Sequence, residues 1–144
     1  MQFIPIKTRP FLPPQDNIFS LFNEYLPPLQ ENDILFITSK ILAIHQGRCI
    51  PIENISKQAL IKQEADQRIA SDVVPGKDIY LTIKHHTLIP SAGIDESNAK
   101  GHYILRPEQL NEDCKQIFTY LCQKFHLNHL GIIITDSTTK PLRW

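Results

Sequence analysis

Apolar residues follow two different spacings along the chain. In four segments they alternate with polar residues or form short continuous runs, which predicts strands; in three others they recur at helical spacing, which predicts helices. The expected strands are residues 2–7, 33–38, 78–90 and 130–135, and the expected helices are residues 17–25, 56–71 and 107–125. The alternation of helices and strands, with no internal repeat, predicts a single α/β (α+β) domain in which helices pack on a mixed sheet.

Cap and turn residues mark the ends of these elements. Asp16 precedes the helix over residues 17–25, where its side chain is expected to cap the first turn, and Pro27 with Pro28 should end that helix. The stretch SKILAIHQGR after the strand 33–38 fits either a short helix or a bent continuation of the strand.

Composition and charge narrow the class of protein. The chain has 144 residues, of which 42% are apolar and 21% charged, as expected for one soluble globular domain. Fifteen basic residues balance fifteen acidic ones, which argues against a nucleic-acid binder with a broad basic surface. No apolar run approaches the roughly 20 residues of a membrane span, and the first residues lack the apolar core of a signal peptide. We therefore expect a cytoplasmic protein that binds neither nucleic acid nor membrane.

The three cysteines are expected to be reduced thiols. Cys114 and Cys122 lie eight positions apart on a predicted helix, which separates them by about 12 Å along its axis, and Cys49 has no C-x-x-C partner. A disulfide needs Cα atoms within roughly 7 Å, so the two helical cysteines cannot pair.

Two acidic loops follow predicted strands. One is SAGIDESN, which contains Asp95, and the other is TDSTT, which contains Asp136. Loops at the carboxyl ends of strands are where α/β sheets bind ligands, and carboxylate and hydroxyl oxygens suit Mg²⁺ or Mn²⁺. An Asp after a strand is also a frequent turn former or helix cap. From spacing alone, both interpretations stay open.

Other polar residues give weaker signals. Lys40 follows a hydroxyl pair at the end of the strand 33–38 and could meet a phosphate as a point charge, although no glycine-rich phosphate loop is present. His85 and His86 are adjacent in a predicted strand, so their side chains should point to opposite faces and not share one metal.

The order of the motifs carries more information than each motif. The chain contains IPIKTRPFLPPQDN, DILFITSKILAIHQGR, SAGIDESN and LGIIITDSTTKPLRW, in that order. This set resembles the coenzyme F-420-0:L-glutamate ligase family, whose corresponding segments are a proline-containing start, G-D-hhhhTSKhhSxxEGR, N-A-G-I-D-x-S-N and hhIxDTxGRPhR. The resemblance covers residues 5–144.

The resemblance implies a γ-glutamyl ligase-like fold in an intertwined homodimer, with this chain as the N-terminal part of a longer domain. It implies an amide-bond-forming enzyme that transfers the γ-phosphate of GTP to a substrate carboxylate. The amine of L-glutamate then attacks the acyl phosphate. The acceptor would be coenzyme F-420-0 or a folate-like molecule with a terminal carboxylate, and the implied ions are Mg²⁺ or Mn²⁺, together with K⁺.

By position in these motifs, the resemblance also assigns residues. The divalent cations would be held by Asp95, Asp136 and Ser137, with Ser137 where the family usually has threonine. The nucleotide site would be lined by Arg9, Pro10, Phe11, Leu12, Ser39, Lys40 and Asn98. Two further departures are Ser91 in place of the family's asparagine, and Thr139-Lys140 in place of Gly-Arg.

Two other functions are compatible with the same residues. IIITDSTT is an apolar strand that ends in an Asp followed by hydroxyls, as in a metal-dependent phosphohydrolase whose nucleophile would be Asp136. A truncated ligase-like domain could instead serve as a non-catalytic dimerisation or binding module.

Overall fold

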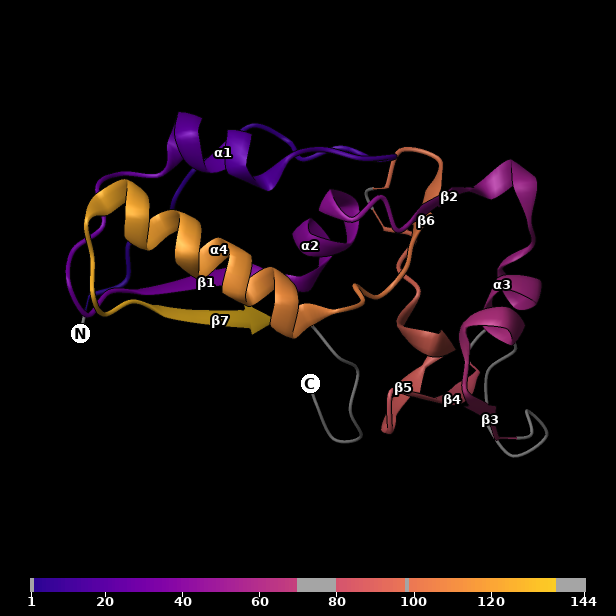
Figure 1. Ribbon diagram of the computed structural model, residues 1–144. Helices are drawn as coiled ribbons and strands as arrows, with labels where there is room; N and C mark the ends of the chain where they lie inside the picture. The colour runs from indigo at the N-terminus through magenta and orange to yellow at the C-terminus, as the bar shows by residue number, and fades with distance from the viewer. Residues whose placement is uncertain (1, 70–79, 98, 137–144) are drawn as a thin grey trace.

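The computed structural model describes residues 2–69, 80–97 and 99–136, which form an α+β arrangement of four helices and seven strands (Figure 1). The predicted fold class is therefore confirmed. The helices are α1 (Ile18–Tyr25), α2 (Ser39–His45), α3 (Lys57–Glu64) and α4 (Leu110–Phe125). The strands are β1 (Ile34–Thr38), β2 (Cys49–Pro51), β3 (Gln67–Arg68), β4 (Leu81–Lys84), β5 (Thr87–Pro90), β6 (His102–Ile104) and β7 (Gly131–Thr135). Short 3₁₀ turns, η1 (Ile52–Asn54) and η3 (Ser91–Gly93), complete the described elements.

The strands divide among three small sheets instead of joining one mixed sheet. β1 and β7 pair in parallel, from Ile34 opposite Gly131 to Thr38 opposite Thr135. β2 pairs with β6, and β3, β4 and β5 form an antiparallel meander. Because β1 and β7 run in the same direction, both of their carboxyl ends reach one edge of their sheet.

The largest core lies under α4. In Figure 1, α4 runs along the β1–β7 sheet with α1 beyond it. Successive side chains of β1 point to opposite faces of the sheet, so Leu35 and Ile37 lie in this core and Phe36 is exposed on the other face. Its fully or nearly buried members come from α1, β1, α2 and α4: Ile18, Phe22, Leu35, Ile37, Leu42, Ile117 and Leu121.

A second core packs α3 against η3 and β6, around Leu60, Ala92 and Tyr103. Between the two cores lies a small cluster of Ala43 and Ile44 from α2 with Ala99 and Ile104, and Phe11 packs against it. Helix α2 therefore contributes to both the first core and this connecting cluster, which places it at the middle of the molecule (Figure 1).

Several predicted elements are confirmed. β1 reproduces the strand expected over residues 33–38, and β7 the one over 130–135, each to within one residue. SKILAIHQGR begins with helix α2, which settles the alternative left open by the sequence. The three cysteines are free thiols, and none of the described helices is long and apolar enough to cross a membrane.

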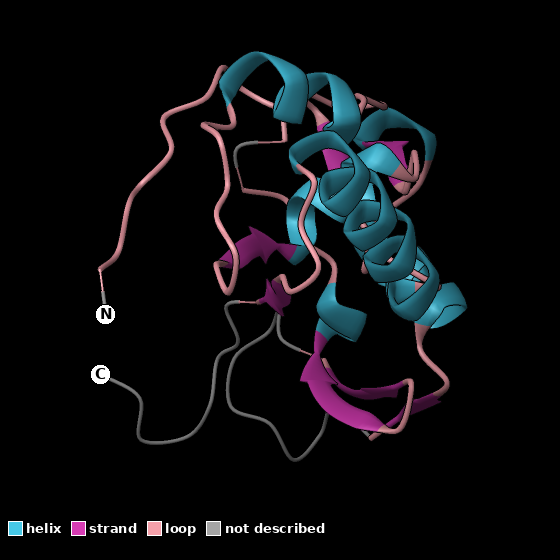
Figure 2. Ribbon diagram, turned by 60° about the vertical axis from the view of Figure 1, so that its left-hand side comes forward, coloured by secondary structure: helices cyan, strands magenta, loops and turns pink. Residues whose placement is uncertain are grey.

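The expected strand over residues 2–7 is not formed, and this segment reaches α1 as an irregular loop (Figure 2). Pro5 has no N–H to donate to a neighbouring strand. The cap of α1 also differs from the prediction. The side chain of Asn17, not that of Asp16, accepts the N–H groups of Phe19 and Ser20.

Helix α3 ends at Glu64, whereas the sequence predicted a helix over residues 56–71, of which the last two lie outside the described residues. Tertiary pairing overrides helix propensity here, because the Asp66 N–H donates to Ile83 and the chain continues into β3. Helix α4 begins at Leu110, three residues later than expected, because Gln109 has a left-handed backbone.

The predicted continuous strand over residues 78–90 is, in its described part, a hairpin of β4 and β5. His85 and His86 form its two-residue turn, with φ of 49° and 58°, as a type I′ turn requires. The expectation that the two imidazoles lie on opposite faces of a strand was therefore wrong. The His85 N–H donates to the Asp66 carboxylate, which links the turn to the segment before β3.

Candidate functional site

The carboxyl end of β1 meets the SAGIDESN loop through Lys40. Thr38 ends β1 and stands at the N-cap position of α2 without a side-chain capping hydrogen bond, so Ser39 and Lys40 begin the helix directly at the edge of the sheet. The Lys40 ammonium forms an ion pair with the Asp95 carboxylate and donates to the Ser97 carbonyl oxygen at 3.2 Å. Two motifs that lie 57 residues apart in the sequence are thereby in direct contact.

The Asp95 carboxylate is held from both sides by its own chain. The backbone of Asp95 exchanges two hydrogen bonds of 2.8 Å with Ile104. The Ser97 N–H and hydroxyl both donate to Asp95 Oδ1, at 2.8 and 2.7 Å. The side chain is still 36% exposed, so the carboxylate is fixed in direction and open to solvent.

The same contacts set the charge of Asp95. Partial burial acts to raise the pKa of this carboxyl, but the hydrogen bonds from Lys40 and Ser97 outweigh it, and the pKa is lowered. Asp95 is therefore ionised at neutral pH, as a cation ligand must be.

The backbone that leads to Asp95 is strained. Ser91, Ala92 and Gly93 have consecutive positive φ angles of 51°, 54° and 73°. A Cβ on Gly93 would lie 2.6 Å from the Arg106 side chain and 2.8 Å from Ile89 Cδ1, so this position needs glycine. Residues held in such conformations collect at ligand-binding sites when the surroundings over-determine them.

Asp136 follows β7 directly. Its neighbour Thr135 is paired with Thr38, so Asp136 leaves the sheet at the edge where Ser39 and Lys40 begin α2. Asp136 is exposed, and Ser137 lies outside the described residues. The parallel register thus places the second predicted cation ligand on the strand end next to the one that leads to Lys40.

The segment 9–12 is tied to the start of α1. Arg9 makes a two-pronged ion pair with Asp16, at 2.5 and 2.8 Å, and this pairing lowers the pKa of Asp16 to about 2. The Leu12 N–H also donates to Asp16 Oδ2, at 3.4 Å. Phe11 packs on the cluster that α2 forms with Ala99, which brings this segment beside the end of the SAGIDESN loop. Pro10 is exposed, whereas Asn98 lies outside the described residues.

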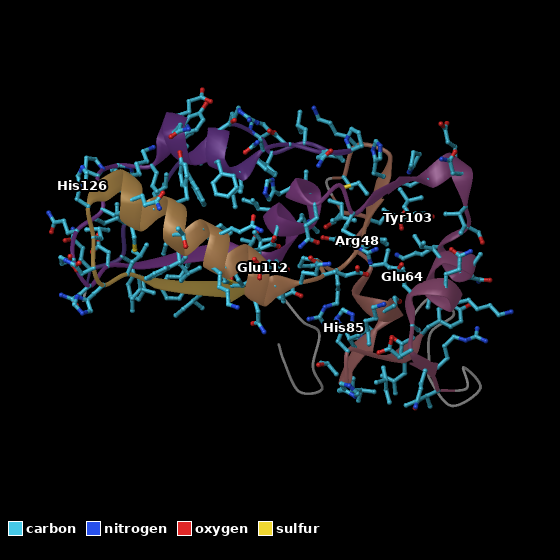
Figure 3. The ribbon with its side chains drawn as sticks, viewed as in Figure 1. Arg48, Glu64, His85, Tyr103, Glu112 and His126 are labelled. Atoms are coloured by element: carbon cyan, nitrogen blue, oxygen red, sulfur yellow. The ribbon has the colours of Figure 1, made fainter. Side chains whose placement is uncertain are left out.

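An ion network supports the centre of the molecule and was not predicted. Arg48 contacts Glu64 at 2.7 Å and Glu108 at 3.1 Å, and Lys84 lies 3.6 Å from Glu64. Figure 3 shows Arg48 and Glu64 side by side, between the elements of the core under α4 and those of the core around α3. These charges come from four different elements or loops, so no local sequence pattern indicates them.

The sequence analysis did not predict the contacts of two further residues, Ser97 and Thr82. Ser97 holds Asp95 through the Asp-x-Ser spacing, which is a recognised signal for a side chain that bonds the backbone two residues on. The buried hydroxyl of Thr82 accepts the Ala92 N–H at 2.8 Å. Thr82 stands in an ordinary strand, and its sequence neighbours give no indication of this contact.

A cation that also binds its substrate needs few ligands from the protein. Within residues 2–69, 80–97 and 99–136, no group of three or more His, Cys, Asp or Glu side chains is close enough to hold a metal alone. Mg²⁺ commonly takes only one or two carboxylates and completes its shell with water and phosphate oxygens. Asp95 and Asp136, the two carboxylates that the sequence predicts as cation ligands, would be enough protein ligands for a site of this kind.

Comparisons with known proteins agree with the motif order. The family model described as F420-0:γ-glutamyl ligase matches residues 6–144. The coenzyme F420:L-glutamate ligase of Methanopyrus kandleri is 27% identical over 145 residues, which cover 90% of this chain and 57% of that protein. The protein of the same name in Methanosarcina mazei is 28% identical and that in Methanosarcina barkeri 23%, each match covering 97% of this chain and 60% of the relative. The chain thus spans about three fifths of the length of these curated relatives.

Proposed function

Because the chain belongs to the F420-0:γ-glutamyl ligase family, we propose that it joins L-glutamate to a substrate carboxylate in a reaction that consumes GTP and needs Mg²⁺ or Mn²⁺. The acceptor would be coenzyme F-420-0 or a folate-like molecule with a terminal carboxylate. In this scheme the γ-phosphoryl group passes to the acceptor carboxylate, and the glutamate amine displaces phosphate to form the amide.

The contact between Lys40 and Asp95 is the observation that supports this proposal most strongly. It joins a predicted phosphate-binding residue, Lys40, to a predicted cation ligand, Asp95, which lies 55 positions later in the sequence. A triphosphate bound through a cation requires these two kinds of group within a few ångströms of each other. An ion pair that served only stability would not need the strained loop that precedes Asp95.

Each residue of the site has a role in the proposed reaction. Asp95 and Asp136, with Ser137, would supply oxygen ligands, and the partly exposed Lys40 ammonium would offer a point charge to a phosphate. Ser39, Asn98 and the segment 9–12 would line the nucleotide. When bound, a divalent cation would neutralise charge on the transferring phosphoryl group.

Binding and turnover by the 144-residue chain test this proposal. GTP with Mn²⁺ should raise the melting temperature, because a ligand that binds only the folded state stabilises it. Asp95→Asn and Asp136→Asn should each abolish that shift, while Glu53→Gln, which changes an exposed carboxylate in η1, should keep it. No shift with the wild-type chain, or the same shift in both Asp variants, would contradict the proposal.

Product analysis separates the competing functions. A ligase forms a γ-glutamyl amide from radiolabelled glutamate and releases GDP. A phosphohydrolase would release phosphate without an amide and would leave a phosphorylated Asp136 to trap. Nucleotide binding without either product would support the non-catalytic module.

A further inference from the structure

Thr82 is the most deeply buried polar residue among those described, with no exposed surface. It lies in β4 opposite Ile89 of β5. Its hydroxyl donates to the Ile89 carbonyl oxygen at 2.5 Å and accepts the N–H of Ala92 at 2.8 Å. One hydroxyl thus connects the hairpin to the strained turn that follows it.

The acceptor that Thr82 offers to Ala92 is needed because of that turn. Ala92 is 2% exposed and has a φ of 54°, so its N–H points away from solvent in a backbone region that alanine rarely adopts. A buried N–H without an acceptor carries a full desolvation penalty. The hydroxyl of Thr82 removes that penalty and fixes the turn at its middle residue.

The turn sets the direction of the chain that carries Asp95. The Ser91 N–H donates to the carbonyl oxygen of Tyr80, two residues before Thr82, at 2.6 Å, and the Ile94 N–H closes the turn on the Ser91 carbonyl oxygen at 3.0 Å. The next residue, Asp95, forms its two backbone hydrogen bonds with Ile104 and meets Lys40. Only two residues separate Ala92 from Asp95, so a change at Ala92 is transmitted to the carboxylate over a short stretch of backbone.

We propose that Thr82 is a positioning residue: its hydroxyl holds the 91–93 turn so that the Asp95 carboxylate is aimed at the cation and at Lys40. This inference rests on the proposed function, because it assigns Asp95 to a cation. Thr82 itself touches neither ligand in this scheme, and it acts through Ala92.

The test compares Thr82→Val with Thr82→Ser in the full 144-residue chain. Valine keeps the shape and removes the hydroxyl, whereas serine keeps the hydroxyl. Two quantities are measured: the affinity for Mn²⁺ alone, by electron paramagnetic resonance, and the exchange rates of the Asp95 and Ile104 amides, by NMR. Ile117→Val, a buried change in the core under α4, is the matched control for lost stability.

We expect Thr82→Val to weaken Mn²⁺ binding by about tenfold or more, the usual cost of losing a residue that orients a metal ligand. It should also accelerate exchange of both amides. Thr82→Ser should restore both values, and Ile117→Val should leave both unchanged. If the Val variant does not fold, Thr82→Val combined with Ala92→Gly carries the same measurements, because glycine adopts the φ of Ala92 without strain.

Two results would overturn the inference. Unchanged amide exchange in Thr82→Val would show that the hydroxyl does not hold the turn. Faster amide exchange with unchanged Mn²⁺ affinity would show that Thr82 stabilises the turn but does not position Asp95 for the cation. Wild-type titrations with Mn²⁺ alone and with Mn²⁺ plus GTP are made before any variant is compared, and if Mn²⁺ binds only with GTP the variants are compared with GTP present. Failure of the wild-type chain to bind Mn²⁺ in both titrations would instead refute the proposed function, and the inference with it.

Discussion

Replacement of Lys40 by methionine should affect the binding of Mn²⁺ and the binding of GTP in opposite directions. In the structure, the Lys40 ammonium occupies the Asp95 carboxylate that a cation would need. Methionine keeps most of the length of the side chain and removes the charge. We therefore expect Lys40→Met to bind Mn²⁺ alone more tightly than the wild type and to bind GTP more weakly, two changes of opposite sign from one substitution.

The size of each change follows from exposure and charge. Both side chains of the pair are about one third exposed, 35% for Lys40 and 36% for Asp95. An ion pair of this kind is worth about 0.2–1 kcal/mol, so its loss should strengthen Mn²⁺ binding roughly 1.4-fold to fivefold. A charged hydrogen bond to phosphate contributes about 1.5–3 kcal/mol, so GTP affinity should fall roughly tenfold to a hundredfold.

Isothermal titration of Mn²⁺, and then of GTP in saturating Mn²⁺, measures both values. Lys57→Met is a close control, because Lys57 is also 35% exposed and pairs at 3.0 Å with Glu96, the residue after Asp95. That variant should change neither affinity by more than about twofold. Weaker Mn²⁺ binding in Lys40→Met, or the same pattern in Lys57→Met, would refute the reasoning.

Two predictions concern stability and are measured by urea unfolding. Asp16→Asn should lower the free energy of unfolding at pH 7 by about 1–2 kcal/mol. The pKa of Asp16 is lowered from 3.8 to about 2, so its contribution is complete above pH 3.8 and disappears as the pH falls to about 2. An equal loss at pH 7 and pH 2 would contradict this. Gly93→Ala should cost about 2–4 kcal/mol, because its Cβ would overlap Arg106 at a φ of 73°. Gly101→Ala is its control, since a Cβ there meets no atom within 4 Å; equal losses in the two would show that the overlap is unimportant.

Elements with their own local signal were predictable from the sequence. β1 and β7 are short apolar runs, and their burial needs no knowledge of the rest of the chain. The end of α3 was not predictable, because residues up to 69 have helical composition, and the helix ends where the Asp66 N–H bonds to Ile83 and β3 pairs with β4. The α1 cap was ambiguous for a different reason: Asp16 and Asn17 are neighbours with equal capping ability, and Arg9 engages Asp16.

The candidate site divides in the same way. The order of the motifs pointed to Lys40, Asp95 and Asp136, and their roles remain predictions. The structure adds the contact between Lys40 and Asp95, and it shows that Lys40 and Asp136 follow the paired ends of β1 and β7. Thr82 and the Arg48 network act through contacts between distant segments. Such contacts leave no periodicity or spacing to read in one sequence.

The parallel pairing of β1 with β7 has a consequence for how the protein folds. Thr38 and Thr135 are neighbours in space, although 97 positions separate them (135 − 38). Closing a loop of that size costs about 4 kcal/mol of chain entropy beyond a constant, and contacts so distant in sequence tend to form slowly. The edge that carries Lys40 and Asp136 therefore does not exist until the last described strand has docked. A nascent chain on the ribosome, even with β1, α2 and the SAGIDESN loop already synthesised, would have no such edge until β7 emerged.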